Sequence, residues 1–163
     1  MKLYDLIDED FVNYKIPSLY LLFPYCTFKC EKECGLRVCQ NSEIAKGPVI
    51  EVDAKKIAKR YTDNTITEAI VMAGLEPLDS FEDIKELLDA LREINFYPDI
   101  VIYTGYWEEE VKDKIQEIVA PGDFHIIVKY GRFVPDRPHR EDPILGVELA
   151  SDNQYAVEYN AAL

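Results

Sequence analysis

Short apolar runs alternate along this chain with longer segments in which apolar residues recur at helical spacing. A run of four to eight residues rich in Val, Ile and aromatic side chains, bounded by Gly or a polar cluster, is typical of a buried strand. Four such runs occur: Leu19–Phe23, Ala69–Ala73, Ile100–Tyr103 and Phe124–Tyr130. We therefore expect four core strands.

The segments between these runs predict helices at 52–60, 81–94 and 107–119. Within the second, the apolar residues fall on one face at the spacing of an amphipathic helix. Asp53 is a plausible N-cap of the first helix, and Asp79 and Ser80 offer cap side chains to the second. Beyond Tyr130, three prolines predict a loop, followed by a short segment at 144–150 and an irregular tail.

Alternation of strand and helix predicts an α/β fold with mainly parallel strands, and the 163 residues fit one domain, 1–163. Loops that follow parallel strands meet at the carboxyl edge of the sheet, where α/β proteins place their sites. A closed eight-stranded barrel takes about 250 residues. The sheet is therefore expected to be an open partial barrel or a flat doubly wound layer.

Charge and composition exclude some functions. Acidic residues outnumber basic ones by 31 to 18, which gives a net charge of −13, and no basic stripe is present, so nucleic-acid binding is not expected. No window reaches the ~18 apolar residues of a membrane span, and the start does not resemble a secretion signal. The sequence predicts a cytoplasmic protein without a membrane anchor.

All four cysteines lie within one short stretch, at positions 26, 30, 34 and 39, directly after the first predicted strand. Cytosolic thiols are kept reduced, so clustered cysteines there are metal ligands or catalysts more often than disulfides. This loop is the strongest functional signal in the chain.

An ordered set of motifs accompanies the cysteines. Cys26-x3-Cys30 is followed by Cys39-Gln-Asn41, and then come four more motifs in order: Gly74-Leu-Glu-Pro77, Ile102-Tyr-Thr-Gly-Tyr106, Gly131-Arg-Phe133 and Ser151-Asp-Asn-Gln154. Together they resemble the radical S-adenosylmethionine enzymes that activate anaerobic ribonucleotide reductase. The resemblance covers nearly the whole chain and implies a partial (βα) barrel of the radical S-adenosylmethionine core type.

Two departures from the family pattern matter. The family has two residues between its second and third cysteines, so the third ligand here is either Cys34 or Cys39. Val38 and Asn41 match the family residues that flank the third cysteine, which favours Cys39 and leaves Cys34 in an inserted bulge. The second departure is Leu75, which replaces a glycine and makes the backbone less free to approach a ligand.

The resemblance implies a 4Fe-4S cluster held by Cys26, Cys30 and Cys39, with the fourth iron open to S-adenosylmethionine. Thiolates are the ligands that iron–sulfur clusters use. The implied cofactor-binding residues are Glu76 with Gly74 and Leu75 at the ammonium, Asn41 near the cluster loop, Thr104 and Gly105 beside the ribose, and Ser151, Asn153 and Gln154 on the outer wall.

The implied partners are the large subunit of anaerobic ribonucleotide reductase, which carries the glycyl radical, and flavodoxin or ferredoxin as electron donor. One alternative is the activation of another glycyl-radical enzyme, although those activases usually carry an added ferredoxin-like insert. The alternative from another class is a zinc-binding interaction module that uses all four cysteines, although structural zinc sites favour two Cys pairs separated by a longer spacer.

Overall fold

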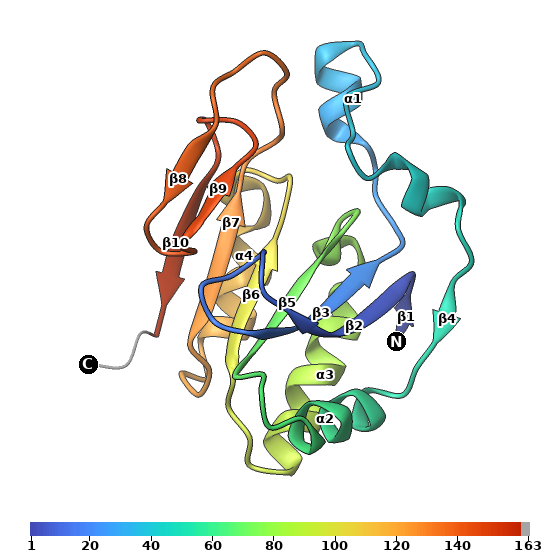
Figure 1. The fold of residues 1–163 in the computed structure, drawn as a ribbon, viewed down its shortest axis with the longest axis vertical. Coiled ribbons are helices and arrows are strands. Elements are labelled where there is room, and N and C mark those ends of the chain that lie inside the picture. The colour runs from blue at the N-terminus through green and yellow to red at the C-terminus, as the bar shows by residue number, and fades with distance from the viewer. Residues whose placement is uncertain (161–163) are drawn as a thin grey trace.

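Six strands form one mixed sheet at the centre of the computed structural model, which describes residues 1–160 (Figure 1). Across the sheet they run in the order β10 (Tyr155–Tyr159), β7 (Ile126–Tyr130), β6 (Asp99–Tyr103), β5 (Ala69–Gly74), β3 (Ser18–Phe23) and β2 (Asp5–Asp10). Two small antiparallel pairs accompany it: β1 (Lys2–Leu3) with β4 (Ile50–Glu51), and β8 (Arg140–Asp142) with β9 (Val147–Leu149).

Helices connect the central strands. They are α1 (Lys29–Cys34), α2 (Ala54–Asp63), α3 (Phe81–Glu93) and α4 (Glu108–Val119), with short 3-10 turns η1 (Ser42–Lys46) and η2 (Pro77–Ser80). Among residues 1–160 no helix is both long enough and apolar enough to cross a membrane.

The four inner strands β3, β5, β6 and β7 are parallel and follow the chain in order. These are the four strands that the apolar runs predicted, so that prediction is confirmed. β2 and β10 flank them and are antiparallel to their neighbours. The expectation of an irregular tail was wrong, because Tyr155–Tyr159 pairs with Ile126–Tyr130. That pairing covers β7, whose five residues are all buried and would otherwise leave an edge of unpaired backbone groups.

The three long helices share one face of the sheet. Ile70, Met72 and Ile102 pack in one buried cluster with residues of α2, α3 and α4, whereas Val71, Val101 and other alternate strand residues face the opposite side. That opposite side packs instead against Tyr14, Leu145 and Leu149, which lie outside the helices. In Figure 1 the three helices accordingly stand on the same side of the sheet.

The predicted helix caps gave mixed results. Asp53 does cap α2, because its carboxylate accepts a hydrogen bond from the Lys55 amide at 2.7 Å. The prediction for α3 was wrong: Ser80 makes no capping bond, and Asp79 bonds to residues of other loops. The η2 turn places Asp79 toward the cysteine segment instead, where its carboxylate accepts hydrogen bonds from the Thr27 amide and the Tyr106 hydroxyl.

Candidate functional site

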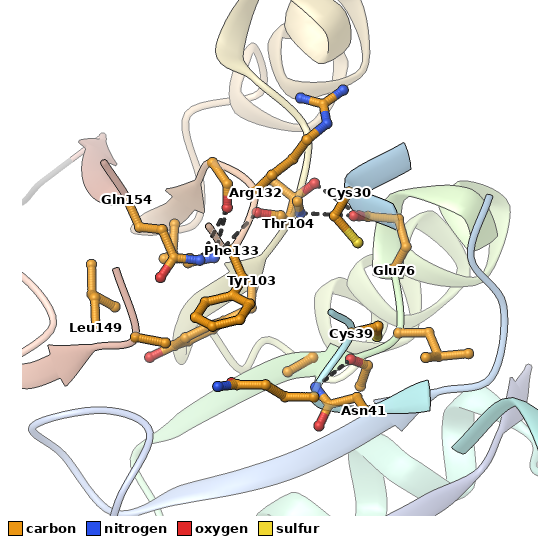
Figure 2. A pocket seen from close by; sticks show the side chains of 18 of the residues that line it. Cys30, Cys39, Asn41, Glu76, Tyr103, Thr104, Arg132, Phe133, Leu149 and Gln154 are labelled. Atoms are coloured by element: carbon orange, nitrogen blue, oxygen red, sulfur yellow. Dashed lines mark hydrogen bonds between the residues drawn. The ribbon is translucent and has the colours of Figure 1, made fainter. Parts of the chain in front are cut away.

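A cavity of about 380 Å³ lies at the carboxyl edge of the parallel strands. Its lining comes from the segments that follow β3, β5, β6 and β7, together with parts of β9 and the loop before β10. The prediction that the motif-bearing loops share one edge of the sheet is therefore confirmed. Figure 2 shows Cys30, Cys39, Asn41 and Glu76 on one side of the cavity, with Leu149 and Gln154 on the other.

The four cysteines are not equivalent. Cys26, Cys30 and Cys39 line the cavity and are partly buried. Cys34 is exposed at the end of α1, does not line the cavity, and points its thiol at the main-chain oxygen of Leu36 at 3.4 Å. The inserted segment that the sequence predicted as a bulge is thus partly helical, and it carries Cys34 away from the other three.

Neighbouring loops hold the first cysteine segment in place. The Thr27 amide donates to Asp79 Oδ2 at 3.0 Å, and the Tyr106 hydroxyl donates to Asp79 Oδ1 at 2.6 Å. The Thr27 and Tyr106 hydroxyls lie 3.3 Å apart. Asp79 from the β5 side and Tyr106 from the β6 side therefore fix the backbone between Cys26 and Cys30.

Burial keeps the cavity thiols protonated in the absence of a metal. It raises the pKa of Cys26 to about 12, despite a hydrogen bond from the Phe28 amide to the Cys26 sulfur at 3.1 Å. Burial also raises the pKa of Cys30, and the nearby Cys39 thiol adds to that rise. Burial raises the pKa of Cys39 as well. A bound metal must therefore displace these protons, and its positive charge supplies the stabilisation that the thiolates lack.

Glu76 is the most deeply buried carboxylate in the lining, with 3% of its surface exposed. It accepts three hydrogen bonds: from the Thr104 hydroxyl at 2.8 Å, from the Gly105 amide at 2.8 Å and from the Leu78 amide at 3.2 Å. Burial still dominates and raises the pKa of Glu76 to about 7. A cationic group bound beside it would restore full ionisation.

Three more of the predicted residues lie at the cavity near the end of β5. Asn41, Gly74 and Leu75 all line the cavity, and the Asn41 side-chain amide donates to the Gly74 carbonyl at 3.0 Å. Gly74 has a φ of 100° and a Cβ there would meet the Phe23 amide nitrogen at 2.6 Å, so only glycine fits. The Leu75 amide is already bonded to the Phe23 carbonyl at 3.0 Å.

Thr104 and Gly105 line the cavity and both donate hydrogen bonds to Glu76. Of the three residues predicted for the outer wall, only one lines the cavity. Gln154 lines the cavity and donates to the Gly131 carbonyl at 3.1 Å. Ser151 and Asn153 do not line it; they bond to the Val134 amide and the Arg132 carbonyl and so brace the loop after β7.

Sequence reasoning gave no role to Lys129 and quoted Arg132 only as part of the Gly131-Arg-Phe133 motif, although both cations line the cavity. Lys129 is 7% exposed within β7, and Arg132, which is 3% exposed, follows that strand. Arg132 donates to both Glu110 oxygens at 2.8 Å and lies 3.1 Å from a Glu33 oxygen of α1. The available signal was a lysine inside the apolar run Phe124–Tyr130, which is costly unless it serves a site.

Structural zinc sites and 4Fe-4S clusters place different demands on cysteine sulfurs. Within residues 1–160 no three Cys, His, Asp or Glu side chains converge closely enough to hold a single metal ion. A structural zinc needs four ligands, with Zn–S distances of about 2.3 Å. A 4Fe-4S cluster contributes its own sulfides and takes one thiolate at each ligated iron, so its cysteines stay apart. Three cysteines line the cavity and are available to such a cluster, whereas Cys34 lies outside the cavity.

Comparison with known proteins supports the same choice. The model of the family described as the 4Fe-4S single cluster domain matches residues 18–149, which include the cavity cysteines and most of the sheet. In the same comparisons no curated protein and no solved structure matches the chain.

Proposed function

The chain belongs to the family of 4Fe-4S single cluster domains, and from that membership we propose an enzyme that cleaves S-adenosylmethionine reductively and installs a glycyl radical on anaerobic ribonucleotide reductase. The observation that carries this proposal is the inequality of the cysteines. Cys26, Cys30 and Cys39 line the cavity while Cys34 lies outside it, which provides three ligands for four irons. An iron without a protein ligand can bind a substrate. A cluster that serves only electron transfer has a thiolate on each of its four irons and offers no such position.

Glu76 supports S-adenosylmethionine as the second ligand. Its carboxylate is held by three donors in a nearly dry position close to the cysteine side of the cavity, where burial raises its pKa and no cation forms an ion pair with it within residues 1–160. The ammonium of S-adenosylmethionine supplies that cation, and such a pair is stronger in a desolvated site than in water. Gly74 and Asn41 complete this side of the cavity, beside the proposed cluster.

The division of labour follows from these positions. Cys26, Cys30 and Cys39 would hold the cluster, which when reduced would supply the electron for cleavage of S-adenosylmethionine to methionine and a 5′-deoxyadenosyl radical. The chain itself binds and orients: Asp79 and Tyr106 fix the cysteine segment, Glu76 holds the ammonium, and Thr104 and Gly105 hold Glu76. The protein thus positions the reactive carbon and restricts what it meets.

We propose that the sheet is the wall of a partial (βα) barrel, and two features of the fold support this. The parallel strands follow chain order and the helices lie on one face, as in a barrel wall, whereas a doubly wound sheet has helices on both faces. We propose that the helix-free face is the inner surface of that open barrel. The reductase would approach it, and flavodoxin or ferredoxin would deliver the electron in the cytoplasm.

The experiment that tests this function uses the reductase from the same source. Protein reconstituted with iron and sulfide under anaerobic conditions is reduced, mixed with S-adenosylmethionine and the reductase, and examined by electron paramagnetic resonance. We expect a doublet signal from a glycyl radical on the reductase. If 5′-deoxyadenosine forms but the reductase stays silent, another glycyl-radical enzyme is the target, since the cleavage chemistry would stand and the partner would not.

A further inference from the structure

Lys129 is a buried lysine that pairs with no acid. It lies on β7, is 7% exposed and lines the cavity. Its ammonium donates to the Gly131 carbonyl at 3.1 Å and to the Thr104 carbonyl at 3.4 Å, and within residues 1–160 it forms no ion pair. An ammonium carries three N–H donors, so one is left for a partner outside the protein.

This arrangement is costly without a ligand. Burial lowers the pKa of Lys129 to about 8, and only the charge of Glu76 opposes that shift. An apolar residue at this place in β7 would avoid the cost of burying a charge. A buried cation that faces a cavity and lacks a counter-ion in contact is a feature of binding sites more than of cores.

Lys129 does not contact Glu76, the group proposed to bind the ammonium. Thr104 lies between the two charged groups: its hydroxyl donates to Glu76 at 2.8 Å, and its carbonyl accepts from Lys129. Gln154 donates to the same Gly131 carbonyl as Lys129 does, at 3.1 Å. In Figure 2 Gln154 stands across the cavity from Cys39 and Asn41, with Thr104 and Tyr103 between. Lys129 therefore lies at the Gln154 end of the cavity.

The surroundings favour a neutral oxygen over an anion as the missing acceptor. Glu76 already balances part of the Lys129 charge from one residue away, and an added carboxylate or phosphate would be repelled by it. Both present partners of Lys129 are peptide carbonyls. The rim beside this end includes Val12, 72% exposed, and the neighbouring Phe11, 61% exposed, which suit contact with a polypeptide.

We propose that Lys129 donates its free N–H to the glycine carbonyl of the target polypeptide and so places the glycine Cα hydrogen for abstraction. This inference rests on the proposed function and adds a substrate-binding residue to it. In the step, the Cα–H bond breaks and a C–H bond forms at the 5′-carbon of the 5′-deoxyadenosyl radical. The unpaired electron remains on the glycine Cα and spreads onto the carbonyl oxygen that Lys129 holds, and no charge changes.

The test follows deuterium from a peptide into 5′-deoxyadenosine. The probe is a short capped peptide with a central glycine deuterated at Cα, and the variants are Lys129→Met and, as control, Lys114→Met. Lys114 also donates to a main-chain carbonyl, that of Leu78 at 2.6 Å, but it lies outside the cavity lining. A hydrogen bond from a charged donor is worth about 1.5–3 kcal/mol, so we expect Lys129→Met to slow deuterium transfer at least about tenfold. The readout is the deuterium transferred per 5′-deoxyadenosine released, which separates glycine placement from any change in S-adenosylmethionine cleavage, and Lys114→Met should behave as the parent protein.

A second peptide isolates the proposed contact. Replacing the glycine carbonyl oxygen by sulfur gives a poorer acceptor, so transfer in the parent protein should slow while Lys129→Met should no longer distinguish the two peptides. Unchanged transfer in Lys129→Met, or equal transfer from both peptides in the parent protein, would overturn the role of Lys129 and leave the proposed function standing. If the parent protein forms no 5′-deoxyadenosine, both the proposed function and the role of Lys129 are wrong.

Discussion

At the scale of single residues, Glu76 is a buried carboxyl whose ionisation depends on its surroundings. It is buried and bonded to Thr104, Gly105 and Leu78, and its pKa rises from 4.5 to about 7. A carboxyl with a raised pKa in the folded state binds its proton more tightly there than in the unfolded chain. The folded state is therefore favoured below pH 4.5, and this advantage is lost as the pH rises through about 7.

Comparison with Glu76→Gln isolates this contribution, since glutamine does not titrate. For protein freed of iron, the free energy of unfolding of the parent relative to Glu76→Gln should fall by about 3 kcal/mol between pH 4.5 and pH 8. Urea denaturation at several pH values measures it. A difference between the two proteins that does not vary with pH would show that Glu76 ionises normally.

At the scale of elements, α1 is held by charges more than by packing, because none of its residues is buried. Lys29 of α1 donates to Glu110 of α4 at 2.8 Å, Arg132 donates to the same carboxylate, and Arg132 also meets Glu33 of α1. The Arg132 guanidinium holds the pKa of Glu110 at about 2. This ion network therefore joins the cysteine-bearing segment to the body of the protein.

Removal of the central carboxylate should loosen α1. For a partly exposed network we expect about 1 kcal/mol, so Glu110→Gln should speed hydrogen exchange across 29–34 about fivefold. Glu43→Gln is the matched control, because the Glu43–Lys46 pair is equally short at 2.7 Å but lies in the exposed η1 turn. If both variants leave exchange across 29–34 unchanged, the network does not hold the helix.

The sequence predicted some elements of this fold and missed others. Buried parallel strands leave continuous apolar runs, so β3, β5, β6 and β7 were predictable, and topology then brought their loops together. β10 was missed because its residues are only partly buried and its pairing with β7 is set by tertiary contacts. The helical turn of α1 was missed because six residues without an apolar face carry no periodic signal.

The site shows the same limit. The motifs named Glu76 and the cavity cysteines, whereas the bracing roles of Ser151 and Asn153 depend on where the loop after β7 runs. Lys129 was visible only as a charged residue in an apolar run, and its two carbonyl partners come from residues 104 and 131. Contacts of this kind depend on strand register, which the sequence alone does not fix.

At the scale of the whole molecule, the groups proposed to bind the cluster, S-adenosylmethionine and the polypeptide lie at one edge of the sheet. The cysteine segment, the buried Glu76 and the buried Lys129 line a single cavity, in which the Lys129 ammonium and the Gln154 amide donate to the same Gly131 carbonyl. The helices cover the far face of the sheet, which leaves the face with Tyr14 and Leu149 for the hairpin β8–β9 and for the proposed polypeptide. The central claim is that three cysteines, and not four, hold the cluster.

That claim is tested most directly by measuring the iron content of anaerobically reconstituted protein and its release of 5′-deoxyadenosine from S-adenosylmethionine after reduction. The parent protein and Cys34→Ala should each bind about four irons and release 5′-deoxyadenosine, because Cys34 lies outside the cavity. Cys39→Ala should lose the cluster and the product together. Loss of the cluster in Cys34→Ala with retention in Cys39→Ala, or a colourless protein that holds one zinc, would contradict the account.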